Sequence, residues 1–448
     1  MSADLAPLRV GIDGYNLALP NGTGVATYGF ALAGTLHRAG HRIEGIYGID
    51  PGADPALREV LFFEALGKAT VPTIGQRRRA AYKRVLKALN PLLSARARDI
   101  ALTGRVDRTP LADRFPPFDR LTSAPDLFAL AMRHFGIFGR FLPLRLADPP
   151  PIMHWTYPVP IEMLGARNIY TLHDLVPLRL PYTTLDGKQR YKALVEGCVA
   201  RAAHICTVSE ASKADIVDQL GADPSHVTNT WLASPMPADA LARDPAEDAG
   251  AVERMFGLKR DGYFLYLGAI EPKKNLGRLL EAFLSLETDT PLAIVGGRGW
   301  QSEQELILLP DKGAGETAHD RILDQRVRRL AHLPRPLLLK LIRGARAVLF
   351  PSLYEGFGLP VLEAMQLGTP VLTSNLGSLP EVAGDAAMLV NPYDIGALTT
   401  GLRMLDQDAA LRRRLAAAGP VQAARFSEAQ YLGRLEAMYA HVLRSSPA

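Results

Sequence analysis

The sequence predicts an α/β protein made of two doubly wound halves, each built on a parallel sheet. Short apolar runs typical of buried parallel strands alternate with helical patterns along the chain. A stretch rich in Pro, Ala and Asp over residues 234–248 interrupts this alternation, which then begins again. At 448 residues the chain is too long for one ordinary domain, so two Rossmann-like halves joined by a linker are expected.

The first half opens with a strand, a glycine loop, a helix and a second strand. The loop reads Pro-Asn-Gly-Thr-Gly-Val-Ala-Thr and contains Gly22 and Gly24, which allow the backbone to come close to a ligand. The same loop is also compatible with a plain turn. The expected strands of this half are 8–13, 43–49, 152–155, 168–172 and 204–208, and the first helix is expected over 28–39.

A histidine and an aspartate follow the strand expected at 168–172. His173 and Asp174 therefore lie at the C-terminal end of a strand, where α/β sheets bind their ligands. A lone histidine is more often structural, but the strand-end position and the neighbouring Asp174 favour a functional site.

The second half contains the most informative segment, a βαβ unit over residues 347–374. After the strand at 347–350, Gly356 and Gly358 bring backbone N–H groups to the start of a helix, which suits a phosphate. Pro360 is expected as the first helical residue. Glu355 and Glu363 flank this turn, and carboxylates accept hydrogen bonds from sugar hydroxyls. The combination predicts a ligand that carries both phosphates and sugars, namely a nucleotide sugar.

This segment, read from Tyr354 to Pro370, resembles the signature of the family-4 retaining glycosyltransferases, which have the GT-B fold and a Glu-x7-Glu pair. The wider run through Glu381 and Gly384 resembles a bacterial mannosyltransferase subgroup that builds surface polysaccharides. The resemblance implies a retaining, metal-independent hexosyltransferase with no cofactor beyond its nucleotide-sugar co-substrate. GDP-mannose is the first expected donor, ahead of UDP-glucose and a rhamnose donor, and a glycan or a lipid-linked molecule is the expected acceptor.

The resemblance also assigns roles to individual residues. Lys274, with Lys273, corresponds to a basic pair that neutralises the departing diphosphate, although many relatives carry an arginine where this chain has Ala269. The expected catalytic residues are His173, Lys274 and Glu355, with Glu355 on sugar hydroxyls. Glu363 is expected on the ribose. The further expected donor contacts are Gly22, Gly24, Lys273, Arg298, Gly356, Phe357, Gly358 and Leu359, with the base near His332 and Leu333.

The same resemblance divides the chain. It implies an acceptor-binding domain over 1–235 with a basic insertion at about 73–150, a linker over 236–252, a donor-binding domain over 253–424, and a terminal segment over 425–448. Apolar residues recur at helical spacing over 428–444, so this segment is expected to form a helix that returns to the first domain.

Composition narrows the function classes. A net charge of +5 is mild for this size and does not require nucleic acid. The two cysteines, Cys198 and Cys206, are expected as reduced thiols of a cytoplasmic protein, without signal peptide or membrane span. The Asp406-Gln-Asp408 spacing falls on a polar helical surface, so no metal site is expected there. A GT-B phosphorylase and a non-catalytic sugar-binding protein remain alternatives, whereas the 21–27 loop fits a Rossmann oxidoreductase poorly.

A basic segment over residues 76–98 carries eight Arg and Lys residues, and its apolar residues between 82 and 89 fall on the opposite face of an expected amphipathic helix. Pro91 is expected to end or kink this helix. The aromatic residues between Phe135 and Pro143 are expected to be exposed nearby. Together they predict peripheral attachment to the inner face of the membrane. The alternative is a solvated helix packed on the first domain.

Overall fold

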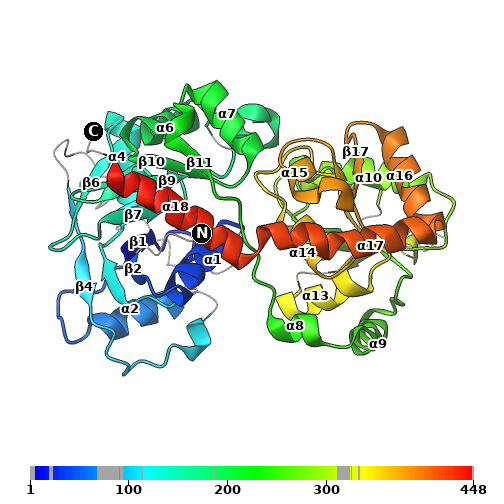
Figure 1. Cartoon of the computed structure of the whole chain (residues 1–448), viewed down its shortest axis with the longest axis horizontal. Coiled ribbons are helices and arrows are strands. Elements are labelled where there is room, and N and C mark those ends of the chain that lie inside the picture. Colours follow the sequence, from blue (N-terminus) through cyan, green and yellow to red (C-terminus); the bar gives the residue numbers. More distant parts are fainter. Residues whose placement is uncertain are drawn as a thin grey trace.

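The computed structural model describes residues 6–19, 24–67, 90, 94–112, 115–184, 187–309, 323, 325–330 and 333–445. Figure 1 shows two halves side by side, each with helices around a central sheet. The predicted α/β class with two doubly wound, mostly parallel sheets is confirmed.

The sheet of the first half has eight strands, with β1 near its centre. All neighbouring strands pair in parallel except β4, which runs antiparallel to β5. Every residue of β7 and β10 is buried, as expected for strands covered on both faces. In spatial order the strands are β11 (Val227–Asn229), β10 (His204–Thr207), β9 (Arg167–Thr171), β7 (Ile152–Trp155), β1 (Arg9–Asp13), β2 (Arg42–Tyr47), β5 (Arg120–Ser123) and β4 (Arg98–Ile100).

A small second sheet and several helices complete this half. The small sheet orders β3 (Ala95–Arg96), β6 (Leu142–Arg145) and β8 (Ile161–Met163). The helices are α1 (Gly24–Arg38), α2 (Arg58–Gly67), α4 (Leu127–Phe138), α5 (Val176–Arg179), α6 (Lys188–Arg201) and α7 (Glu210–Leu220).

The sheet of the second half is parallel throughout. Its spatial order is β14 (Val327–Leu330), β13 (Leu292–Val295), β12 (Phe264–Leu267), β15 (Ala347–Phe350), β16 (Val371–Ser374) and β17 (Met388–Val390). In chain order this is 3-2-1-4-5-6, the doubly wound order that reverses between β12 and β15. Ligands of such sheets bind at that switch point, beyond the C-terminal ends of the strands.

The helices around this sheet alternate with its strands. They are α10 (Leu276–Leu284), α11 (Ser302–Glu305), α13 (Arg335–Gly344), α14 (Leu359–Gln366), α15 (Leu379–Ala383), α16 (Ile395–Gln407) and α17 (Ala409–Ala423). Their inward residues pack with the strands into continuous apolar clusters on the two faces of the sheet.

Two helices occupy the segment expected as a linker, residues 236–252. They are α8 (Ala238–Ala242) and α9 (Pro245–Phe256), and α9 extends four residues beyond that range and packs on α13. The Asp244 carboxylate accepts a hydrogen bond from the Ala246 N–H and Pro245 follows it, a standard helix start. The Pro, Ala and Asp residues of this segment therefore encode two helices of the second half, of which α9 has a side-chain cap.

The last helix, α18 (Glu428–Arg444), lies along the first half, whereas α17 lies along the second (Figure 1). The Thr35 hydroxyl donates to the Glu428 carboxylate at 3.0 Å. The hydroxyl of Tyr439, a fully buried residue of α18, lies 2.7 Å from the His154 ring in β7. The chain thus crosses between the halves once at residues 230–235 and returns at residues 424–427.

One expectation about the first half is wrong. Phe135 and Phe141 are 7% and 6% exposed, because they pack in an apolar cluster with residues of distant segments, so they form no aromatic surface. Arg96 and Arg98, which follow the expected helix end or kink at Pro91, lie in strands β3 and β4. The rest of the basic segment 76–98 falls outside the described residues except for residues 90, 94, 95 and 97. Among the described helices, none is both long and apolar enough to cross a lipid bilayer.

Candidate active site

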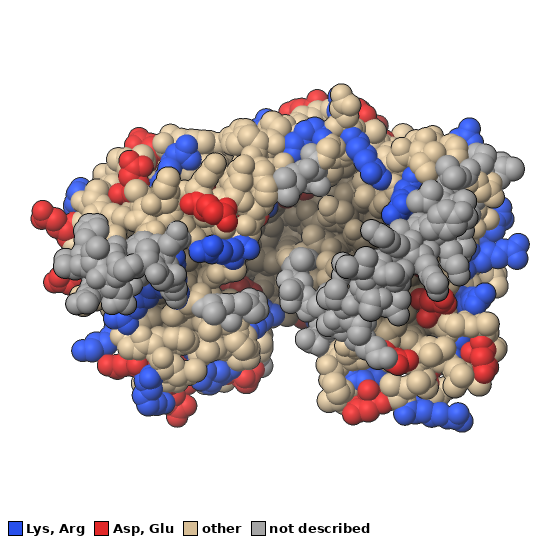
Figure 2. All heavy atoms as spheres, turned by 180° about the vertical axis from the view of Figure 1, so that it is seen from behind, with Lys and Arg blue, Asp and Glu red and all other residues tan. Residues whose placement is uncertain are grey.

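A deep hollow separates the two halves on the face shown in Figure 2. A cavity of about 510 Å³ lies between the halves, at the switch point of the second sheet, and residues of both halves line it. It brings together most of the predicted site residues: Gly24, His173, Lys273, Lys274, Glu355, Gly356, Phe357, Gly358, Leu359 and Glu363.

The lysine pair sits on a single 3-10 turn, Pro272–Lys274, that follows β12. The Nζ of Lys274 lies 2.5 Å from the Glu355 carboxylate and 4.8 Å from the centre of the Phe350 ring. Asn275 fixes the turn from behind, since its side-chain amide donates to carbonyl oxygens beyond β15 and β17 at 3.1 and 2.7 Å. The ammonium group is therefore held at the carboxyl end of the sheet by neighbours on both sides.

The charges around this turn are coupled. Burial acts to raise the pKa of Glu355, but Lys274 and Lys273 outweigh it and hold that pKa below its usual range. Burial acts to lower the pKa of Lys273, but the carboxylates of Glu355, Asp174 and Glu271 outweigh it and raise that pKa. Lys273 and Lys274 thus place two ammonium groups side by side at the end of β12, where they can meet the oxygens of a diphosphate.

Two glycines of the turn after β15 have close neighbours, Gly356 in the first half and Gly358 in helix α15 of the second half. A Cβ on Gly356 would lie 2.6 Å from the carbonyl oxygen of His173, a distance that real Cβ atoms do not reach. Gly358 has φ +113°, and a Cβ there would lie 2.6 Å from Leu379. Helix α14 begins at Leu359, so Pro360 is its second residue and not its first as expected. The turn therefore requires glycine at both positions.

Glu363 lies in the second turn of α14, and its carboxylate is held from two directions. The Arg335 guanidinium at the start of α13 donates to it at 3.0 Å, and the Ser234 hydroxyl donates at 3.2 Å. Burial raises the pKa of Glu363, although Arg335 and Ser234 act against that rise. The carboxylate is fixed at the cavity wall with 15% of its side chain exposed, which suits hydrogen bonding to hydroxyls.

His173 faces the same cavity from the end of β9. Its Nε2 lies 2.8 Å from the Thr156 carbonyl oxygen, and since a carbonyl only accepts, Nε2 carries the proton. Burial lowers the pKa of His173, so the ring is neutral at pH 7 with Nδ1 as an acceptor. The Tyr28 ring packs edge-on against the imidazole, with the two ring centres 4.8 Å apart. The imidazole is thus oriented by two fixed neighbours.

Some expected residues lie elsewhere. Arg298 is exposed and is not among the residues that line the cavity. Its backbone forms a parallel bridge with Ile270, the residue before Glu271. Gly22 and His332 fall outside the described residues, and Leu333 does not line the cavity.

Sequence reasoning missed Arg335 and Glu271. Glu271 lines the cavity and lies 3.6 Å from the Lys273 Nζ. Arg335 follows β14 after a short connection, so the rule that strand ends carry the site would have pointed to it. Its pairing with Glu363 was not visible, because residues 28 positions apart give no local signal.

The Asp406-Gln-Asp408 spacing has structural uses. The Asp406 carboxylate accepts hydrogen bonds from Thr288, Thr290 and Arg346, and Asp408 caps the start of α17. Within the described part of the chain, no three His, Cys, Asp or Glu side chains gather in a way that could hold a metal ion. Independence from metal stays a prediction.

Comparison with known proteins identifies the family. The model of the family described as glycosyl transferases group 1 matches residues 255–422. The O-antigen chain mannosyltransferase B of Escherichia coli is 36% identical over 267 residues, which cover 58% of this chain and 67% of that protein. The chain is a member of the group 1 glycosyltransferases. The expected enzyme class is thereby confirmed.

Some other relatives of this glycosyltransferase match over a smaller share of their own length. The serotype-specific mannosyltransferase WbdA of Escherichia coli is 29% identical over 284 residues, and these span 61% of this chain but 33% of that protein. Among solved structures, the sucrose-phosphate synthase of Thermosynechococcus elongatus superposes with a TM-score of 0.62 at 17% identity, covering 98% of this chain and 100% of that one. Such neighbours confirm the predicted GT-B fold for this glycosyltransferase.

The charge of Glu355 should make the stability of this glycosyltransferase depend on pH. Its folded-state pKa lies below the ordinary value of 4.5, so the carboxylate stabilises the fold above pH 4.5 and loses this effect as the pH falls through the lowered pKa. Replacing Glu355 by glutamine should therefore lower the melting temperature more at neutral pH than at roughly pH 4. Thermal melts of both proteins across this range measure the difference. If the two melting temperatures differed by the same amount at every pH, the stabilising ion pair of Glu355 would be contradicted.

Proposed function

We propose that the protein transfers a hexose from a nucleotide-diphosphate sugar, with GDP-mannose as donor and with retention at the anomeric carbon. The observation that carries the proposal is that two carboxylates, each fixed by a cation, converge on one cavity at the switch point. Lys274 holds Glu355, and Arg335 holds Glu363, on either side of the Gly356–Gly358 turn. The name of the 36% identical O-antigen chain mannosyltransferase supports mannose and surface-polysaccharide synthesis.

Each group has a role in this reaction. As the bond between the sugar and the diphosphate breaks, Lys274 and Lys273 stabilise the negative charge that grows on the diphosphate, without requiring a metal. The amides of the Gly356–Gly358 turn bind phosphate and sugar oxygens at the start of α14. Glu355 accepts hydrogen bonds from sugar hydroxyls and Glu363 from the ribose, while His173 orients the sugar from the opposite wall.

A smaller cavity beside the donor site suits the acceptor. It measures about 210 Å³ and shares His173, Asp174 and Lys273 with the larger cavity. Tyr157 and Tyr191 line its far side, and each offers an apolar face and a polar tip. We assign it to the end of a glycan, free or carried on a lipid, because the attacking hydroxyl would then lie next to the donor sugar.

The donor is tested by thermal shift with GDP-mannose, UDP-glucose, UDP-GlcNAc, dTDP-rhamnose, their parent nucleotides and NAD, all without added metal. A ligand at about 100 times its Kd adds about 2.7 kcal/mol to the folded state and raises the melting temperature measurably. A shift with GDP-mannose and GDP is expected. A shift with NAD alone, or with no nucleotide sugar, would contradict the proposal.

We also propose that the enzyme works in the cytoplasm and attaches peripherally to the inner membrane face. Cys198 and Cys206 are both buried free thiols, which supports a reducing compartment. The basic residues Arg77, Arg78 and Arg79 belong to the segment that would contact anionic lipid. Reversing these three charges should abolish co-flotation with anionic liposomes, measured by flotation in a density gradient. Equal flotation of both proteins would refute the attachment.

A further inference from the structure

A second cavity lies at the N-terminal ends of the strands of the second sheet, whereas the active site lies beyond their C-terminal ends. Its volume is about 460 Å³, and residues just before β12, β15 and β16 line it, namely Asp261, Arg346 and Pro370. The active-site residues follow the other ends of strands β12 and β15. The start of α9, the end of α13 and the first two turns of α17 complete its walls. This cavity is therefore separated from the donor cleft by the length of the strands.

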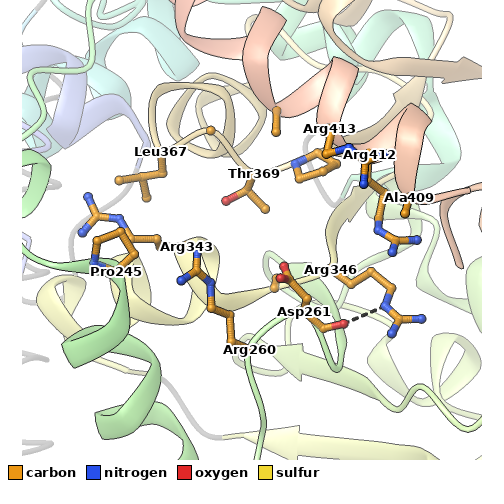
Figure 3. A pocket seen from close by; sticks show the side chains of 14 residues that line it. Pro245, Arg260, Asp261, Arg343, Arg346, Leu367, Thr369, Ala409, Arg412 and Arg413 are labelled. Atoms are coloured by element: carbon orange, nitrogen blue, oxygen red, sulfur yellow. Dashed lines mark hydrogen bonds between the residues drawn. The ribbon is translucent and has the colours of Figure 1, made fainter.

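Arginine dominates the charged lining of this cavity. Asp261 is the single carboxylate among the lining residues, against five guanidinium groups: Arg260, Arg343, Arg346, Arg412 and Arg413. Figure 3 shows Arg260 and Arg343 across the cavity from Arg412 and Arg413, with Arg346 beside Asp261. Positive groups thus face one another from different elements around one hollow.

Two of the five guanidinium groups are neutralised by carboxylates outside the lining. Arg343 donates to the Asp248 carboxylate at 2.9 Å, and both side chains are less than 10% exposed. Arg346 binds the Asp406 carboxylate and donates to the Asp261 carbonyl oxygen at 2.7 Å. These two arginines hold the walls of the cavity in place.

The other three lack such partners. Arg412 donates only to carbonyl oxygens, those of Leu405 and Asp406 at 2.8 Å each, so its charge meets no carboxylate among the described residues. The side chains of Arg260 and Arg413 make no hydrogen bond or ion pair with any residue in the described part of the chain. Three guanidinium groups are thus left with Asp261 as the carboxylate in the lining.

The chemistry of this arrangement selects a phosphate. A guanidinium is planar and presents paired N–H donors that match two phosphate oxygens, and several around one hollow can surround a dianion. The small residues Ala345, Gly368, Ala409 and Ala416 leave the space open, and the volume falls in the range of small-molecule sites. We propose that this cavity is a second ligand site, which binds a phosphate-bearing molecule through Arg260, Arg412 and Arg413.

The test uses inorganic pyrophosphate and two double variants with equal change in charge. Arg260→Glu/Arg413→Glu alters the cavity, whereas Lys259→Glu/Arg414→Glu alters exposed neighbours that do not line it. Both leave the donor cleft unchanged, so pyrophosphate bound there is common to all proteins. Calorimetric titration should show a site in the wild type and in the control that is weakened at least about tenfold in the cavity variant. Indistinguishable titrations of all three proteins would overturn the proposal.

A second measurement does not depend on the fold of a variant. Phenylglyoxal modifies accessible arginines, and peptide mass spectrometry locates the products. Pyrophosphate should protect Arg260 and Arg413 in the wild-type protein and leave Arg414 reactive. Equal reactivity of all three arginines with and without pyrophosphate would refute the site.

A flotation experiment with lipid vesicles tells whether the phosphate belongs to a lipid headgroup or to a soluble compound. Vesicles of phosphatidylcholine with phosphatidylglycerol are mixed with the same three proteins and floated. Flotation that is lost only in Arg260→Glu/Arg413→Glu, together with weakened pyrophosphate binding in that variant, supports the site and identifies a lipid headgroup. Pyrophosphate binding at the cavity without such a loss supports the site and identifies a soluble phosphate compound. Absence of both effects contradicts the proposal. The test involves no sugar donor, so its failure leaves the proposed function untouched.

Discussion

Replacing Lys274 by methionine should lower kcat by about 10²–10³-fold while changing the donor KM much less. The ammonium group lies in the cavity at the end of β12, where it can meet the diphosphate. The charge on the diphosphate increases as the sugar departs, so the interaction is stronger in the transition state than in the bound donor. Methionine keeps an unbranched chain that is one atom shorter and removes the ammonium group. Steady-state kinetics with the donor varied measures both constants.

The controls must distinguish a slower sugar-transfer step from unfolding of the Lys274→Met protein. Lys274 is also the partner of the buried Glu355, so the variant leaves a carboxylate without its ion pair. Lys274→Met/Glu355→Gln removes both charges, and Lys259→Met removes an exposed lysine outside the site. Melting temperatures of all variants show whether the fold survives. A Lys274→Met protein with wild-type kcat and a raised KM would reverse the assigned role.

Replacing Glu363 by glutamine should raise the donor KM by about 10–100-fold and leave kcat within about threefold, since hydrogen bonds to a charged group contribute about 1.5–3 kcal/mol. The carboxylate is already oriented by Arg335 and Ser234, so it can accept hydrogen bonds from ribose hydroxyls without reorganisation. Calorimetric Kd values for GDP should rise by the same factor, because this contact belongs to the nucleotide. Glu281→Gln, at an exposed position of α10, serves as the matched control.

A cycle with altered nucleotides tests the ribose contact itself. Deleting the 2′- or the 3′-hydroxyl of GDP should weaken binding to the wild-type protein. The same deletion should cost little in Glu363→Gln if the carboxylate is the partner of that hydroxyl. Additive losses for both deletions would show that Glu363 acts on another part of the donor.

Local patterns were sufficient to predict the strand and the glycine turn through which the second half lines the cavity. The strand at 347–350, the Gly-Phe-Gly turn and the helix stop at Gly368 all follow from local preferences, and the strand agrees to the residue. Such patterns also indicate which strand ends carry chemistry, as for Lys274 and His173. They succeed because turn glycines and buried strands are determined within a few residues of the chain.

What escaped prediction depends on long-range packing. Phe135 and Phe141 look exposed in sequence but are buried, because the elements that cover them come from distant segments. Arg298 follows a strand as Lys274 does, yet its side chain is exposed and does not line the cavity. The pairing of Arg335 with Glu363, and the arginine-lined cavity on the far edge of the sheet, join residues that no local pattern relates.

The most direct test of the account is sugar transfer itself. The wild-type protein and Lys274→Met are incubated with GDP-mannose and a mannose-terminated acceptor that carries a hydrophobic tail. Mass spectrometry then detects an added hexose, and NMR identifies the anomeric configuration of the new linkage. The account predicts an α-linked mannosyl product from the wild-type protein and almost none from the variant. A β-linked product, or equal transfer by both proteins, would contradict the account.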